Sequence, residues 1–407
     1  MAPEQEFVSK FGLPLPSLTE AVPTSEKREA LDVRFVATPD IPALNFWAMQ
    51  GLAALFDQKE KLFCQRGGLS GGGFYRENAS RRRTIIALLG LQRLLDIGGR
   101  VPFDLAPIRE ATLQDRSWVQ GIGDIGLLTW FTAICAPERL EEVLRGFELE
   151  NALESFPDGR KGCTTELAWF LAGIAHAQLA GASTIHDLTD VAAETYHRLQ
   201  DNQGETGIFG QMASPDSVWQ IFRRRFGTLA DQSYGIYAFA TFARAFEIEE
   251  PLECALACAN AICGLQGEQG QWWSQYDKRT GRVVGQYPLS AIYQDGIAPA
   301  GLLALGDTID RSFHAAILKG LSWVTGGNEL GIDFRKTDRD LPCGSIGFKE
   351  DASQRRSAVR NFLGIRRPTP VELLRIKRES RPDHFGWLLY AFGSAGLPKV
   401  IAAHATK

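Results

Sequence analysis

The sequence predicts an all-α protein whose helices form an (α/α)6 toroid, a closed ring of alternating inner and outer helices. Apolar residues recur at helical spacing almost throughout the 407 residues, whereas alternating, strand-like runs are short and few. Amphipathic segments also alternate with segments that are apolar on most sides, as expected where protein surrounds a helix. Six segments of the second kind, interleaved with about six of the first, favour a closed ring.

The amphipathic segments are the expected outer helices, and most end in a glycine-rich turn followed by an aromatic residue. Glycine adopts the left-handed conformation that ends a helix, and the aromatic side chain then fills the next layer. We expect these helices at Ile41 to about Lys61, near Phe103–Glu110, and at Ile185–Leu199, Pro251–Leu265 and Ser312–Val324.

The apolar segments are the expected inner helices, and each begins with polar residues. The N-terminal ends of inner helices commonly converge on one face of such a ring, so we expect a pocket there. The six predicted helices are at about Ser80–Leu95, Trp118–Ile134, Thr164–Leu179, Ala230–Phe246, Gln294–Leu305 and Asp383–Ala395.

The toroid is expected to span residues 41–397, between an N-terminal extension at 1–40 and a tail at 398–407. An Arg-rich insertion at about 336–381 interrupts the sixth repeat. Because Pro368 and Pro370 interrupt any helix there, we expect this insertion to lie over one rim as a loop or lid.

The repeat pattern over about residues 41–397 resembles the α/α toroid superfamily, which includes six-hairpin glycosidases and terpenoid cyclases. The turn from Gln266 to Trp272 is similar to the glutamine–tryptophan repeats of triterpene cyclases. In the cytosolic unsaturated-uronyl hydrolases, a six-hairpin family, aspartates at inner-helix starts act on the sugar, and the resemblance implies Asp124 with Asp231 or Asp295 in that role. The DxDD and DDxxD motifs of terpenoid cyclases are absent from the sequence.

Acidic residues lie at the starts of five predicted inner helices: Asp124, Glu166, Asp231, Asp295 and Asp383. Capping of the helix N-terminus explains any one of them alone. Five on one face would surround a cavity, and two at a suitable separation form a general acid/base pair. We predict Asp231 and Asp295 as this pair, assisted by Asp124 or by His384, the one histidine at a predicted pocket position.

Aromatic and amide side chains near the fifth inner helix suit a sugar ring, because ring faces stack and amides bind hydroxyls. A carbocation is an equally suitable ligand for the aromatic faces. Arg81 to Arg83 begin an inner helix, where cations are disfavoured, so a compensating anion is expected; a solvated surface is the alternative. The predicted substrate-binding residues are Trp273, Tyr287, Tyr234, Gln294, Glu166 and Arg83.

The net charge and the absence of certain motifs argue against several classes of function. The 44 Lys and Arg against 48 Asp and Glu give a net charge of −4, which offers nucleic acid no overall positive field. No apolar run reaches the roughly 18 residues of a membrane span and no signal-peptide pattern is visible, so we expect a cytoplasmic protein. Seven scattered cysteines fit reduced thiols. No metal or other cofactor is expected, because Cys254, Cys258 and Cys263 lack a nearby histidine and no GxGxxG follows a predicted strand.

Together these features favour an intracellular carbohydrate-active enzyme. It would act on an anionic glycoside or oligosaccharide as a hydrolase, lyase or epimerase through carboxylate acid/base chemistry. Two alternatives stay open: a terpenoid-cyclase-like enzyme whose aromatics line a drier cavity, and a non-enzymatic scaffold that binds a glycan or a protein.

Overall fold

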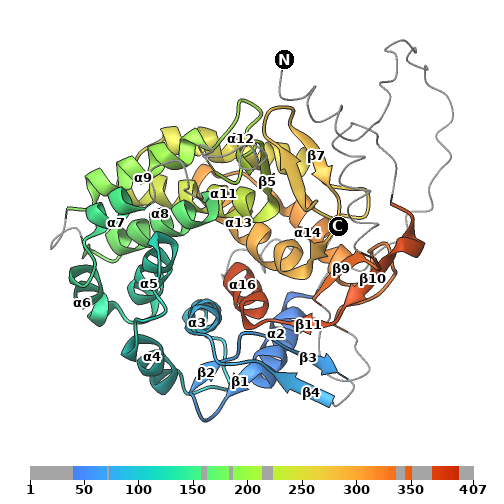
Figure 1. The fold of residues 1–407 in the computed structure, drawn as a ribbon, viewed down its shortest axis with the longest axis horizontal. Coiled ribbons are helices and arrows are strands. Elements are labelled where there is room, and N and C mark those ends of the chain that lie inside the picture. Colours follow the sequence, from blue (N-terminus) through green and yellow to red (C-terminus); the bar gives the residue numbers. More distant parts are fainter. Residues whose placement is uncertain are drawn as a thin grey trace, which may run out of the picture. The chain divides into compact units, whose positions relative to one another are not determined.

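Six inner helices pack side by side in a closed ring within the part of the chain that the structure describes (Figure 1). The computed structural model describes residues 40–70, 73–156, 163–182, 187–212, 223–335, 344–350 and 369–393, all within the unit Ala37–Lys407. Each inner helix packs against the next, and the last packs back against the first. In chain order they are α3 (Arg81–Asp96), α5 (Ile122–Cys135), α8 (Thr164–Leu179), α11 (Leu229–Phe246), α13 (Ala298–Ile309) and α16 (Pro382–Phe392).

An outer helix covers each inner one, which confirms the predicted (α/α)6 toroid. In the described ranges the outer helices are α2 (Ile41–Leu55) on α16, α4 (Leu105–Gln114) on α3, α6 (Leu140–Arg145) on α5, α9 (Thr189–Asp201) on α8, α12 (Glu250–Gly264) on α11 and α14 (His314–Val324) on η3. Shorter helical pieces are η1 (Pro137–Arg139), α7 (Leu149–Ser155) and η4 (Val371–Leu373).

The fifth inner helix begins differently from the others. Its first turn is the π-helical segment η3 (Ile292–Ile297), which continues directly into α13. A π-helical turn widens the helix by one residue and is frequent at functional sites. The predicted start at Gln294 therefore falls inside this wider turn.

Glycines set the separation between some inner helices. A Cβ atom added at Gly126 on α5 would overlap the backbone of Trp169 and Phe170 on α8, and one added at Gly90 on α3 would overlap Gly386 on α16. Because only glycine lacks this atom, the backbones of these helix pairs approach one another closely. This fixes the relative positions of the helix starts that carry the acidic residues.

Short antiparallel strands join the hairpins at the rim. They form four small sheets, β1–β2, β11–β3–β4, β5–β6–β7 and β10–β9–β8. Their bounds are β1 (Phe56–Asp57), β2 (Leu62–Phe63), β3 (Gly67–Ser70), β4 (Gly73–Arg76), β5 (Phe226–Thr228), β6 (Gln275–Asp277), β7 (Arg282–Gly285), β8 (Leu289–Ser290), β9 (Ser345–Phe348), β10 (Leu374–Lys377) and β11 (Glu379–Ser380).

The described parts of the 336–381 insertion are more ordered than the predicted loop. Strands β9, β10 and β11 all lie in it, and Ile346 on β9 pairs with Ile376 on β10 in antiparallel register. A strand of four residues is too short for its alternating pattern to stand out in the sequence, which explains the difference. The arginine clusters at 355–356 and 366–367 lie outside the described residues.

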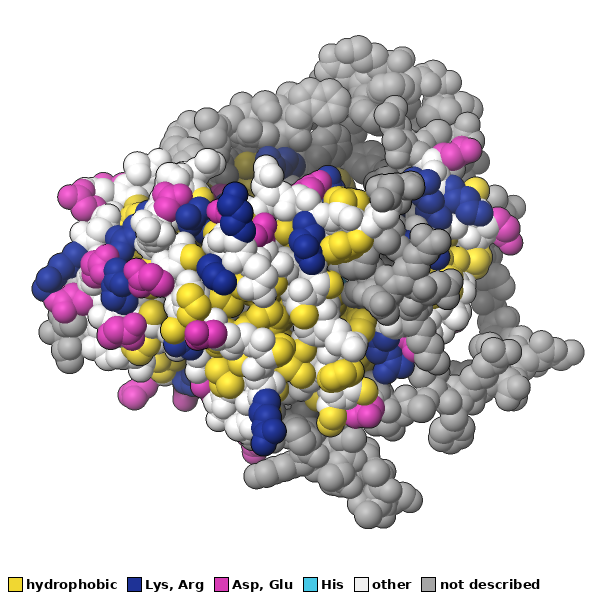
Figure 2. Space-filling model, turned by 90° about the horizontal axis from the view of Figure 1, so that it is seen from below, with side chains coloured by type: hydrophobic (Ala, Val, Ile, Leu, Met, Phe, Trp, Pro, Cys, Tyr) yellow, Lys and Arg dark blue, Asp and Glu magenta, His cyan; other side chains and the backbone are white. Residues whose placement is uncertain are grey.

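Hydrophobic side chains also reach the surface. Figure 2 shows the face that looks down in Figure 1, where they gather between scattered charged side chains. Outer helix α2 contains no charged residue, and its Phe46 is 59% exposed. None of the described helices combines the length and the apolar composition that crossing a bilayer requires.

Candidate active site

Five of the six inner helices in the described ring carry an acidic residue in their first turn, as the sequence predicts. These residues are Asp124 on α5, Glu166 on α8, Asp231 on α11, Asp295 on η3 and Asp383 on α16. An outer helix returns the chain after each inner one, so all inner helices begin at the same end of the ring. The remaining inner helix, α3, begins with three arginines instead.

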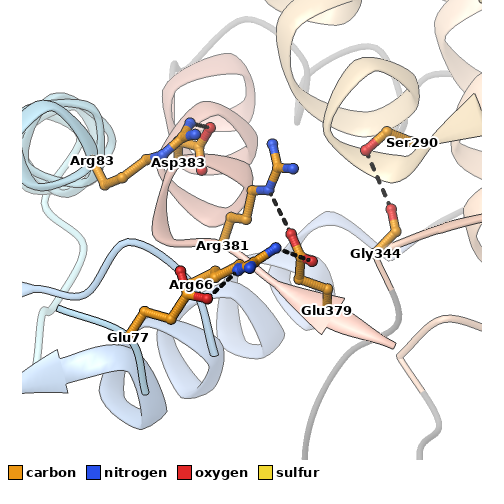
Figure 3. A network of polar contacts seen from close by, with 8 residues as sticks. All are labelled: Arg66, Glu77, Arg83, Ser290, Gly344, Glu379, Arg381 and Asp383. Atoms are coloured by element: carbon orange, nitrogen blue, oxygen red, sulfur yellow. Dashed lines mark hydrogen bonds and ion pairs between the residues drawn. The ribbon is translucent and has the colours of Figure 1, made fainter. Parts of the chain in front are cut away.

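Two of these arginines are paired with acids on the two neighbouring helices. Arg82 contacts Asp124 on α5, and Arg83 contacts Asp383 on α16 (Figure 3 shows the second pair). Asp124 also accepts a hydrogen bond from the backbone N–H of Gln120 at 3.1 Å. Successive helix residues point about 100° apart, so adjacent arginines can reach helices on opposite sides. These pairs supply the anions that compensate for cations at a helix N-terminus.

Asp231 is buried and accepts hydrogen bonds from two neighbouring segments. Its Oδ2 accepts from the backbone N–H and the hydroxyl of Thr228, at 2.8 Å and 2.7 Å, in a capping box that starts α11. Its Oδ1 accepts from the Thr165 hydroxyl of α8 at 2.9 Å. Burial raises the pKa of Asp231, while the threonine donors and the charge of Arg223 oppose that rise. Asp231 therefore caps its own helix and also faces α8.

Glu166 lies beside Asp124 where α5 and α8 approach closely. A Cβ atom added at Gly123, next to Asp124, would lie 3.0 Å from Glu166 Cγ. Burial, and then the negative charge of Asp124, raise the pKa of Glu166. The two carboxyl groups thus have different surroundings, because Asp124 is paired with Arg82, whereas Glu166 forms no ion pair within the described ranges. Such a difference separates a proton donor from an ionised neighbour.

Asp295 of η3 and His384 of α16 form a buried pair. His384 Nε2 lies 2.8 Å and 2.9 Å from the two Asp295 carboxyl oxygens, and the side chains are 5% and 0% exposed. Trp47 of α2 meets the His384 ring edge-on at 5.6 Å, and Phe385 stacks on it. Burial raises the pKa of Asp295, against the effect of His384. The pairing of Asp231 with Asp295 as acid and base stays a prediction, and the elements that carry them, α11 and η3, pack against each other.

Aromatic side chains stand among the acids. Tyr234 of α11 packs edge-on against Trp169 of α8 at 5.3 Å and against Trp387 of α16 at 5.6 Å. The Arg82 guanidinium lies 5.9 Å from the centre of the Trp169 ring. Tyr293 of η3 is close enough to Asp383 and Asp231 for their charges to raise its pKa in addition to burial, the main cause. Four aromatic residues, from α8, α11, η3 and α16, therefore lie near the acidic side chains.

Arg381 brings a positive charge to the same place from the insertion. Its Nε donates to Glu379 of β11 at 3.0 Å, and Arg66 donates to the same carboxylate at 3.0 Å (Figure 3). The charges of Asp383, Glu379 and Tyr293 raise the pKa of Arg381, against its burial. Its side chain is 47% exposed, so the guanidinium remains accessible.

Trp273 and Tyr287, predicted to stack on a ligand, lie together, and the carbonyl of Ser274 beside Trp273 accepts from the Leu229 N–H at the start of α11 at 3.2 Å. Their rings meet edge-on at 6.4 Å, and Tyr287 meets Phe348 of β9 at 5.8 Å. Trp273 Nε1 donates to the Leu265 carbonyl at 3.0 Å. In the described part of the chain, no ring contact or hydrogen bond joins this pair to the acidic residues.

Gln294 is also predicted to bind substrate, but its side chain is fully buried and satisfied by protein. Its oxygen accepts from the Trp272 N–H and its amide nitrogen donates to the Trp272 carbonyl, both at 2.8 Å. One repeat earlier, Gln232 of α11 makes the same two contacts with Phe209, at 2.7 Å and 2.9 Å. In both repeats an inner-helix glutamine holds the aromatic residue that follows a glycine turn.

Sequence reasoning missed three residues of this end: Trp169, Tyr293 and Arg381. Trp169 follows Glu166 by three positions, so helical spacing places both on one face. Tyr293 and Arg381 each precede a predicted acidic position by two residues. Across the described residues, no group of three or more histidine, cysteine or acidic side chains is arranged to hold a metal ion.

This architecture is an (α/α)6 toroid with acidic residues at the inner-helix starts. No protein-family model matches the sequence, and no curated protein matches it. Solved structures with the same fold include the unsaturated glucuronyl hydrolase of Bacillus sp. GL1, at 14% identity and a TM-score of 0.55, covering 87% of this chain and 96% of that one.

Two further solved structures share the fold. A possible GH105 family member from Salmonella enterica subsp. enterica serovar Paratyphi A has 12% identity and a TM-score of 0.54, with 89% of this chain and 95% of that chain covered. A sugar epimerase from a ruminal bacterium has 11% identity and a TM-score of 0.56, with 88% and 99% covered. At these identities the similarity is one of fold.

Proposed function

We propose that this protein is a carbohydrate-active enzyme that acts on an anionic glycoside or oligosaccharide at the N-terminal end of its inner helices. The observation that carries the proposal is the set of acids from five inner helices, with aromatic and arginine side chains among them. The names of the three similar structures, two hydrolase-related proteins and a sugar epimerase, support a sugar substrate.

Glu166 and Asp231 are the proposed acid/base groups. Glu166 is favoured as the proton donor, because burial and the neighbouring Asp124 both favour its protonated form. Asp231 faces α8 through Thr165 and is the proposed base. Asp124 keeps a negative charge beside Glu166 while paired with Arg82.

The Asp295–His384 pair has a positioning role in this proposal. Because the two side chains are hydrogen-bonded to each other, they hold the π-helical turn against α16. Tyr293, in the same turn, faces the acids, so the pair sets where its hydroxyl lies.

Arginines are the proposed ligands of the substrate's acidic group. Guanidinium groups bind carboxylates in two-pronged fashion. Arg83, predicted for this role, is 20% exposed and paired with Asp383. Arg82 and Arg381, each 47% exposed, have more surface to offer a ligand. This charged surrounding does not favour the drier pocket of a terpenoid-cyclase-like enzyme.

The test is turnover of acidic di- and oligosaccharides, including substrates that end in an unsaturated glucuronyl residue, by wild type, Glu166→Gln and Asp231→Asn. Reducing-end release and mass spectrometry detect the products. Loss of a general acid or base lowers the rate by roughly 10²–10⁴-fold, and we expect losses of that order for both variants. Glu150→Gln, on exposed α7, is the matched control and should keep wild-type activity. No turnover by wild type, or equal turnover by all four proteins, would contradict the proposal.

A further inference from the structure

A small cavity lies at the opposite end of the ring from the acidic residues. It has a volume of about 30 Å³, enough for about two water molecules. The C-terminal halves of α3, α11 and α16, with α13, surround it. The polar residues that line it are Arg93, Tyr237, Thr241, Arg244, Asp307 and Tyr390.

Two arginines reach this cavity from helices that are not neighbours in the ring. Arg93 lies in the last turn of α3 and Arg244 in the last turn of α11. Within the described residues neither guanidinium has a hydrogen bond or ion pair to a protein group. Arg93 Nε is buried without a hydrogen-bond partner, although the guanidinium lies 5.1 Å from the centre of the Tyr390 ring, and Arg244 is exposed. Arg82 and Arg83, in contrast, are each paired with an aspartate.

The helix dipole alone accounts for a cation near a helix C-terminus. It does not account for two cations that converge on one cavity from separate helices. Asp307 of α13 is exposed at the same cavity and offsets one of these charges, which leaves the lining with a net positive charge.

The uncharged lining adds hydrogen-bonding groups without adding charge. His176 Nε2 lies 2.8 Å from the Tyr237 hydroxyl, which lies 2.5 Å from the Tyr390 hydroxyl. Burial, and then the charges of Arg244 and Arg93, lower the pKa of His176 to about 3, so this histidine is neutral near pH 7. Burial also raises the pKa of Tyr237 well above its usual value. The charge of the cavity is therefore that of two arginines against one aspartate, Asp307.

We propose that this cavity binds a small tetrahedral oxyanion, of the size of inorganic phosphate or sulfate, between Arg93 and Arg244. Guanidinium groups match such oxygens with paired N–H donors. The cavity is too small for a sugar ring, so the site is separate from the proposed carbohydrate site and does not depend on it. A bound anion would join α3 to α11 across the ring.

The test is a titration of the whole protein with inorganic phosphate and with sulfate at constant ionic strength, with chloride as the background. Calorimetry gives the dissociation constant, and thermal unfolding gives the matching stabilisation. Four variants are compared with wild type: Arg93→Gln, Arg244→Gln, Asp307→Asn and, as a matched control, Arg100→Gln, which removes an exposed arginine outside the cavity.

We expect saturable binding of phosphate or sulfate. Arg93→Gln and Arg244→Gln should each weaken it about 10- to 100-fold, the usual effect of removing a hydrogen bond to a charged group. Asp307→Asn should tighten it, because it removes the negative charge, and a misfolded variant would not give this gain. Arg100→Gln should bind as wild type does. Absence of saturable binding of both anions, equal binding by the two cavity-arginine variants and wild type, or no tightening in Asp307→Asn overturns the proposal.

Discussion

Replacing Gln294 with leucine tests whether this buried glutamine holds the fold or binds a ligand. The substitution leaves the N–H and the carbonyl of Trp272 without the two 2.8 Å partners that they now have. Each buried, unsatisfied group costs about 1–3 kcal/mol, and leucine recovers part of this by apolar burial. We expect a net loss of about 3 kcal/mol in the free energy of unfolding.

Urea unfolding followed by tryptophan fluorescence measures this loss, because Trp272 itself is fully buried. Gln58→Leu is the matched control, since Gln58 is exposed and the hydrogen bond that it accepts from Lys61 is 3.5 Å long. It should change stability by less than about 0.5 kcal/mol. A Gln294→Leu protein that is as stable as the Gln58→Leu control, yet loses ligand binding, would refute the structural role and restore the substrate-binding prediction.

Three further predictions follow from other contacts. His176→Asn should flatten the pH dependence of stability, because the pKa of His176 is about 3 in the folded protein and 6.5 in the unfolded chain. Measured by urea unfolding, wild type should lose about 2 kcal/mol of stability relative to this variant between pH 7 and pH 5. Arg82→Met should cost about 1–2 kcal/mol, a moderate loss because Arg82 is half-exposed, and adding Asp124→Asn should recover most of it in a double-mutant cycle; additive losses would contradict this. Gly126→Ala should lower the melting temperature through overlap with α8, whereas Gly264→Ala, which has open space in the last turn of α12, should not.

The inner helices were predictable because their apolar periodicity is long. All six predicted segments overlap the observed helices, and the acids that start five of them lie where the sequence places them. A helix of several turns repeats its pattern enough to be recognised, and an N-terminal acid is a local signal. Ring closure then brings these starts to one end.

The partners of each acid were not predictable, because they come from segments far apart in the chain. His384 was predicted to assist Asp231 and Asp295, but its direct contact with Asp295, 89 residues away, depends on a π-helical turn that leaves no clear sequence signal. The role of Gln294 depends on a backbone contact 22 residues away. In the same way, Arg83 was predicted to bind substrate, but it is paired with Asp383 because α16 closes the ring beside α3.

Closure of the ring has a consequence for how the chain folds. The Arg83–Asp383 contact between α3 and α16 joins residues 300 positions apart, whereas neighbouring hairpins meet over much shorter separations. Contacts between distant residues slow folding, because the intervening chain must first give up its conformational freedom. In an open repeat array the terminal repeats can unfold on their own, but in this ring α3 and α16 each have an inner-helix neighbour on both sides. Assembly should therefore end with a single late step, the docking of α16 against α3, and the end of the ring that carries the acidic residues is complete only after it.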